Sequence, residues 1–137
     1  MASGIWIKMR REILTKIESV NEIAEEIGKD ENVVAVYLFG SYASGKQHPL
    51  SDIDLCVIIK DRNKEYETTL PASDNLDVSF FHRLPITIKY RVFTEGKALL
   101  IKDRNFVDDL RIDTVNEYID FKPHLNKFLF ERFKCTI

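Results

Sequence analysis

The chain has 137 residues, of which 45% are hydrophobic and 31% are charged. A chain of this length can bury about two thirds of its unfolded surface, so we expect one folded domain rather than a disordered segment. Twenty basic and 22 acidic residues give a net charge of −2, which disfavours general binding to a nucleic-acid backbone. The longest uncharged run, 32–45, is too short to span a bilayer, and we expect neither a signal peptide nor membrane association.

Apolar residues from Trp6 to Ile27 recur at steps of three and four, which predicts a helix over about 6–27 that stops at Gly28. The uninterrupted apolar run 33–39 predicts a strand that is buried on both faces. The polar stretch 60–75 is expected to be a connection between strands. The following segments predict three more strands: 52–59, 76–81 and 98–101.

Pro85 and Gly96 bracket a further predicted helix, since proline favours the first turn of a helix and glycine its end. Asp103 can cap the next helix, which Pro123 is expected to break or kink before a last helical piece. We therefore expect a single domain over 1–137, with a core over about 33–103 and C-terminal helices over about 104–134. This order of elements indicates an α/β (α+β) fold with a small mixed sheet and helices mainly on one side.

Three features at the ends of the first two strands point to phosphate and metal chemistry. Gly40 and Ser41 end a strand, where free backbone N–H groups and a hydroxyl can hold phosphate oxygens. Asp52 and Asp54 are two residues apart on a predicted strand and therefore share one face. Hard carboxylate oxygens with open positions for phosphate suit Mg²⁺.

Asp77 lies on the next predicted strand and is flanked by apolar residues. A carboxylate buried among apolar side chains is costly unless it is paired or binds a metal, so we expect Asp77 to complete the metal site. It could also accept the proton of an attacking hydroxyl. Each feature alone has a simpler explanation: a turn, a solvated strand face or an ordinary ion pair. Their order along the chain favours a site.

Cysteines and histidines add no second site. Cys56 and Cys135 lie far apart in neither a disulfide nor a metal pattern, which fits a reducing cytoplasm. His48, His82 and His124 are scattered without metal-ligand spacing. The C-terminal segment carries four phenylalanines among basic residues, which fits either a packed amphipathic helix or a partner-binding surface.

The order Gly40-Ser41-x3-Gly45-x6-Asp52-x-Asp54, followed by Asp77, resembles the nucleotidyltransferase fold of the DNA polymerase β superfamily. The size and layout resemble its smallest members, the minimal nucleotidyltransferase (MNT) proteins, including the MNT antitoxins of HEPN/MNT toxin–antitoxin modules. The resemblance covers about 33–123. Ser44 departs from it, because many relatives carry a basic residue there.

The resemblance implies an enzyme that uses ATP and Mg²⁺, with two ions expected, to transfer AMP to a hydroxyl. The implied acceptor is a tyrosine of a HEPN ribonuclease toxin, which the protein would neutralise as an antitoxin. Asp52, Asp54 and Asp77 would be the catalytic and metal-binding residues, and Gly40 and Ser41 would bind the nucleotide. Two alternatives stay open: neutralisation of a toxin by binding alone, and nucleotidyl transfer to a small molecule. A hetero-oligomer and a homodimer are both compatible with the sequence.

Overall fold

The computed structural model describes residues 19–40, 52–71 and 75–133. Its centre is a mixed four-stranded sheet with the order β3-β2-β1-β4. Strand β1 runs antiparallel to β2 and to β4, whereas β2 and β3 are parallel. The expected small mixed sheet is confirmed. The strands have these bounds: β1, Val33–Phe39; β2, Ile53–Ile59; β3, Leu76–Phe80; and β4, Lys97–Ile101.

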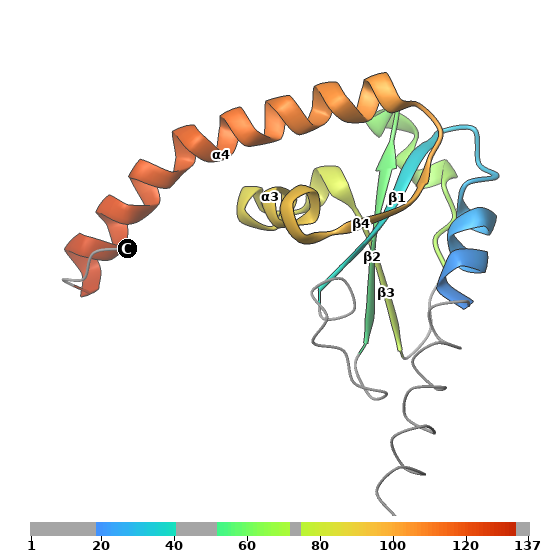
Figure 1. Ribbon diagram of the computed structural model, residues 1–137, viewed down its shortest axis with the longest axis horizontal. Coiled ribbons are helices and arrows are strands. Elements are labelled where there is room, and N and C mark those ends of the chain that lie inside the picture. Colours follow the sequence, from blue (N-terminus) through green and yellow to red (C-terminus); the bar gives the residue numbers. More distant parts are fainter. Residues whose placement is uncertain (1–18, 41–51, 72–74, 134–137) are drawn as a thin grey trace, which may run out of the picture.

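Helices cover both faces of the sheet (Figure 1). Helix α3 (Ile86–Glu95) and the beginning of α4 (Arg104–Phe133) cover one face, and helical residues 19–27 cover the other. The central strands β1 and β2 send apolar side chains into both layers, as a strand buried on two faces should. Val36 and Leu38 pack toward 19–27, whereas Tyr37 packs toward α3 and α4.

Residues 19–27 confirm the described part of the predicted N-terminal helix, and 6–18 lie outside the described residues. Gly28 follows its last turn as expected, and its N–H donates to the carbonyl of Ala24 at 2.9 Å. The ammonium of Lys102 then donates to the carbonyls of Gly28 and Asp30, at 2.8 and 2.9 Å. A cation there satisfies carbonyls that the helix end leaves unpaired, and it ties the end of β4 to this helix.

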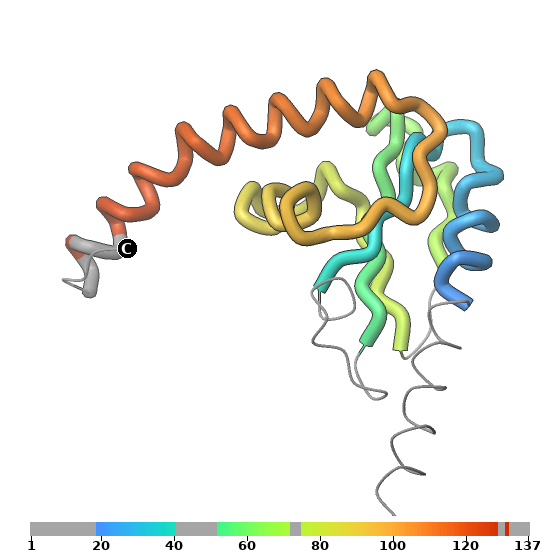
Figure 2. Tube along the Cα trace, viewed as in Figure 1, coloured from blue at the N-terminus to red at the C-terminus, as the bar shows by residue number. Residues whose placement is uncertain are grey.

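Pro123 was expected to break or kink the C-terminal helix. A break is wrong, because Pro123 lies inside α4, a single helix of 30 residues. Proline removes a single backbone donor from the ladder, and good helix formers on both sides can carry the helix through it. Figure 2 follows α4 as one continuous coil that curves away from the sheet. Although α4 is long, no helix in the described part of the chain is apolar enough to cross a membrane.

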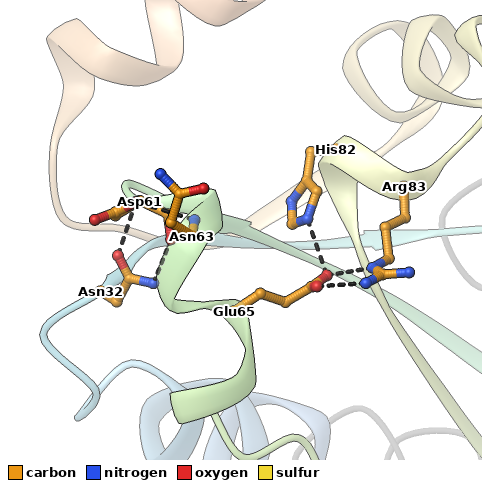
Figure 3. A network of polar contacts seen from close by, with 6 residues as sticks. All are labelled: Asn32, Asp61, Asn63, Glu65, His82 and Arg83. Carbon is orange, nitrogen blue, oxygen red and sulfur yellow. Dashed lines mark hydrogen bonds and ion pairs between the residues drawn. The ribbon is translucent and has the colours of Figure 1, made fainter.

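The connection 60–75 contains a short 3₁₀ helix, η1 (Arg62–Glu67), which two polar contacts anchor (Figure 3). The side chain of Asn32 exchanges two hydrogen bonds with the backbone of Asp61, at 2.8 and 3.0 Å. The carboxylate of Glu65 accepts from Arg83 and contacts His82 Nε2 at 2.9 Å, joining η1 to η2 (Phe81–Arg83). Arg83 holds the pKa of Glu65 below its ordinary value. This end of the sheet is thereby closed by a fixed polar network.

Candidate functional site

Asp54 lies on β2 at the opposite end of the sheet from η1. Its strand neighbours in register are Phe39 on β1 and Asp77 on β3. The residues on either side of it, Ile53 and Leu55, are buried in the layer that packs against 19–27. Asp54 therefore points to the other face, where it is half-buried. The predicted alternation, with carboxylate on one face and apolar residues on the other, is confirmed for this residue.

The parallel register places Asp77 directly beside Asp54. Because paired residues on neighbouring strands share a face, the two carboxylates lie on the same side of the sheet. Asp77 is exposed, so the expectation that it is buried among apolar residues is wrong. Edge strand β3 leaves it open to solvent, and the register with Asp54, rather than burial, is what brings Asp77 into the site.

Gly40 closes the other side of Asp54. Its φ of 78° is a left-handed conformation that a side chain rarely adopts. A Cβ built there would meet the carboxylate oxygen Oδ2 of Asp54 at 2.4 Å, closer than real side chains approach. Only glycine therefore fits at the end of β1 while Asp54 keeps its position, and the strand end remains open for close approach by a ligand.

Three causes raise the pKa of Asp54 above its ordinary value. Burial is the largest, and the charges of Asp77 and Asp52 add to it. All three act in the same direction, because burial and nearby negative charge both disfavour the ionised form. The site is a set of mutually repelling carboxylates, which is the electrostatic arrangement that a bound cation relieves.

Asp52 precedes β2 rather than lying on it, and its side chain is exposed. It still acts electrostatically on Asp54. Ser41, the other residue expected to hold phosphate, lies outside the described residues. Of the predicted set, the structure thus gathers Gly40, Asp52, Asp54 and Asp77 around one strand end.

No group of three or more His, Cys, Asp or Glu side chains among the described residues has the geometry to hold a metal ion by itself. The oxygen donors of Asp52 and Asp54, and the open approach beside Gly40, nevertheless fit Mg²⁺. Magnesium typically takes one or two carboxylates and completes its shell with water and substrate phosphates.

The histidines of the described residues stand apart from this site. His82 contacts Glu65 and stacks on Phe80 with ring centroids 5.5 Å apart. His124 is an exposed residue of α4, and His48 lies outside the described residues. No sequence pattern indicated the contacts of His82, which link the two 3₁₀ helices η1 and η2. The carboxylate site lies at the other end of the sheet.

Comparison with known proteins identifies the family. Residues 21–105, more than half of the chain, match the model of the polymerase beta, nucleotidyltransferase family. The chain belongs to this family. The matched region contains Gly40, Asp52, Asp54 and Asp77, so the carboxylate cluster lies within the nucleotidyltransferase core.

One relative is a protein of Methanocaldococcus jannaschii that is named as a protein adenylyltransferase. It is 33% identical over 67 residues, which make up 49% of this chain and 55% of that protein. The chain therefore spans about half the length of this curated relative.

Solved structures share the fold at low sequence identity. One, described as a toxin–antitoxin with AMP-PNP, has a TM-score of 0.65 at 18% identity and covers 84% of this chain and 98% of its own. A second, described as a tri-AMPylated HEPN toxin of Shewanella oneidensis with an MNT antitoxin, has a TM-score of 0.59 at 15% identity and covers 90% and 99%. A nucleotidyltransferase-type protein of Sulfolobus solfataricus has a TM-score of 0.51 at 24% identity and covers 69% and 87%. These likenesses show the same fold over a larger share of the chain than the family match covers.

Proposed function

We propose that this protein transfers AMP from ATP to a hydroxyl group, with a tyrosine of a HEPN toxin as the acceptor, and so acts as an antitoxin in the cytoplasm. The observation that carries the proposal is the position of Asp54 against Gly40 and beside Asp77, with Asp52 near enough to act on it electrostatically, in a chain of the nucleotidyltransferase family. The relative named as a protein adenylyltransferase supports AMP transfer to protein. The fold likeness to an AMPylated toxin with its MNT antitoxin supports the choice of partner.

In the proposed reaction, the acceptor oxygen attacks the α-phosphorus of ATP, the bond to the β-phosphate breaks, and pyrophosphate leaves. Asp77 accepts the proton of the hydroxyl, a role that its exposed position beside Asp54 permits. Gly40, and Ser41 after it, hold phosphate oxygens through N–H and hydroxyl groups. Asp52 and Asp54 would hold a cation, which would help to position the triphosphate.

Mg²⁺ would neutralise the charge that develops on the phosphates, and two ions are expected in this type of transfer. Asp52, Asp54 and Asp77 are the residues that would hold the ions. Burial is the main cause of the raised pKa of Asp54, and the charges of Asp77 and Asp52 add to it; a nearby cation would relieve this second, electrostatic part.

The test is transfer of labelled AMP to a purified HEPN toxin, with Asp54→Asn as the loss-of-function variant. We expect the label on a toxin tyrosine to fall at least about a hundredfold, since a lost metal ligand typically costs this much or more. Asp113→Asn is the matched control, because it makes the same change on the exposed side of α4 away from the site. Full transfer by Asp54→Asn would overturn the proposed chemistry.

A growth-rescue experiment distinguishes neutralisation of the toxin by AMP transfer from neutralisation by binding alone. A cell that expresses the toxin should be rescued by the unchanged protein and by Asp113→Asn, but not by Asp54→Asn. Equal rescue by Asp54→Asn would instead establish neutralisation by binding alone. Labelling of a small-molecule hydroxyl with no label on the toxin would establish the other alternative acceptor.

A further inference from the structure

Apolar residues of α4 lie along two of its sides. One side packs on the body of the protein, where Val107 is fully buried and the ring of Tyr118 stacks on Tyr90 at 3.8 Å between centroids. On another side, Ile112, Val115 and Ile119 follow one another at steps of three and four residues. The two isoleucines are each 59% exposed. The fold of a single copy therefore leaves the two isoleucines exposed, with the partly buried Val115 between them.

Charged residues extend this row at each end. Asp108 lies four residues before Ile112, and Lys122 lies three residues after Ile119. The steps of four, three, four and three are those of a coiled-coil seam, whose positions keep to one side of a helix. We name the five residues from Asp108 to Lys122 at these steps the α4 seam. Among the described residues, neither Asp108 nor Lys122 takes part in an ion pair.

We propose that the α4 seam pairs with the α4 seam of a second copy of this chain, antiparallel, about a two-fold axis near Val115. Val115 lies seven residues from Asp108 and seven from Lys122. Antiparallel pairing about Val115 therefore brings Asp108 of each copy beside Lys122 of the other. The isoleucines fill the centre, and the same surface serves both copies, as a two-fold interface requires.

Charge selects both the partner and its direction. A parallel pair would set Asp108 against Asp108 and Lys122 against Lys122, and like charges at a seam disfavour that arrangement. The seam has one charge of each sign at equal distances from its centre, so its best complement is a reversed copy of itself. Figure 1 shows α4 extending well beyond the sheet.

The interface is small, with three apolar residues and one arm of each charge pair per copy. Interfaces of this size are below the standard range of stable complexes, so we expect association at tens of micromolar rather than at nanomolar concentration. Sedimentation velocity of the full chain over this range should show the mass rising from 16.0 kDa toward twice that value. A monomer at every concentration up to about 500 µM would overturn the proposal.

Charge exchange tests the geometry. Asp108→Lys alone and Lys122→Asp alone should each weaken self-association at least about tenfold, because each places two like-charge contacts in the pair. An equimolar mixture of the two variants, and the double variant, should both regain it. The two positions are about 21 Å apart along one helix, so the rescue can arise only between copies.

Asp109→Lys is the matched control, since it makes the same charge change one residue away from the seam, and it should leave association unchanged. Ile112→Ser with Ile119→Ser should abolish association while leaving the thermal transition in place, because both side chains are exposed. A dimer that survives both charge reversals would use another surface and would overturn the proposal. None of these outcomes depends on nucleotide transfer.

Discussion

At the scale of single residues, the position of Asp54 accounts for the glycine at position 40. The half-buried carboxylate occupies the space where a side chain at position 40 would begin, and the left-handed backbone of Gly40 keeps that space open. The glycine of the Gly-Ser pair is therefore required by packing against Asp54, in addition to any role toward phosphate. The same contact makes the conformation of the strand end sensitive to the position of the carboxylate.

Gly40→Ala should destabilise the protein by about 1–2 kcal/mol, the usual cost of a left-handed alanine, and more if Asp54 must move. The new Cβ would lie 2.4 Å from Asp54 Oδ2 in the present arrangement, so one of the two groups has to shift. The free energy of unfolding, measured with denaturant, gives the size of the effect.

A double-mutant cycle with Asp54→Ala separates the two contributions. If the carboxylate is the obstacle, Gly40→Ala should cost less in the Asp54→Ala background than in the unchanged protein, with a coupling of at least about 0.5 kcal/mol. Strictly additive free energies would mean that backbone strain alone accounts for the cost.

At the scale of elements, local patterns in the sequence predicted most of the described structure. The apolar run 33–39 is β1 with the expected bounds, and Pro85 and Gly96 flank α3 as expected. The strand predictions 76–81 and 98–101 fall within one residue of β3 and β4. These signals are local, because a buried strand and a helix end are each marked by residues that are adjacent in the sequence. The continuity of α4 was missed because the prediction gave Pro123 more weight than the helix-forming residues on both sides of it.

Pro123→Ala should stabilise the second half of α4. Proline in a helix interior costs about 3 kcal/mol relative to alanine, and we expect part of this cost to be recovered locally. Amide hydrogen exchange in residues 119–127 should slow by roughly tenfold, which corresponds to about 1.4 kcal/mol of local stability. Asn116→Ala is the control, since it also introduces alanine at an exposed position of α4. Equal slowing by both variants would indicate a general gain in helix propensity rather than relief at Pro123.

At the scale of the whole molecule, the site depends on the topology of the sheet. Spacing predicted that Asp52 and Asp54 lie together, because they are two positions apart in the sequence, although only Asp54 lies on β2. The approach of Asp77 depends on the parallel pairing of β2 with β3 and on its register, which link segments distant in the sequence. No local pattern encodes that register, and the burial argument used for Asp77 failed since β3 is an edge strand. The register places Asp77 beside Asp54, and its role in the site stays a prediction.

The electrostatic repulsion at this site makes stability depend on pH and on ligand. The folded state raises the pKa of Asp54, so it holds the proton more tightly than the unfolded chain does. Stability is therefore lost as pH rises from the ordinary aspartate value through the raised one, and the loss persists at neutral pH. Because Asp54 is only half-buried, solvent screening limits the effect. Without metal, Asp54→Asn should raise the Tm at pH 7 by about 1–3 °C and leave it unchanged well below pH 3.

With Mg²⁺ and ATP bound, the unchanged protein should become more stable than Asp54→Asn, the reverse of the order without metal. Ligand at a hundredfold excess over Kd stabilises the folded state by about 2.7 kcal/mol, which is several degrees of Tm for a domain of this size. We expect that shift for the unchanged protein and for Asp113→Asn, little shift with ATP alone, and none for Asp54→Asn with both ligands. A thermal-shift titration measures all four cases. An equal shift for Asp54→Asn and the unchanged protein would mean that the cation binds elsewhere, and the carboxylates would then have to be explained without a metal.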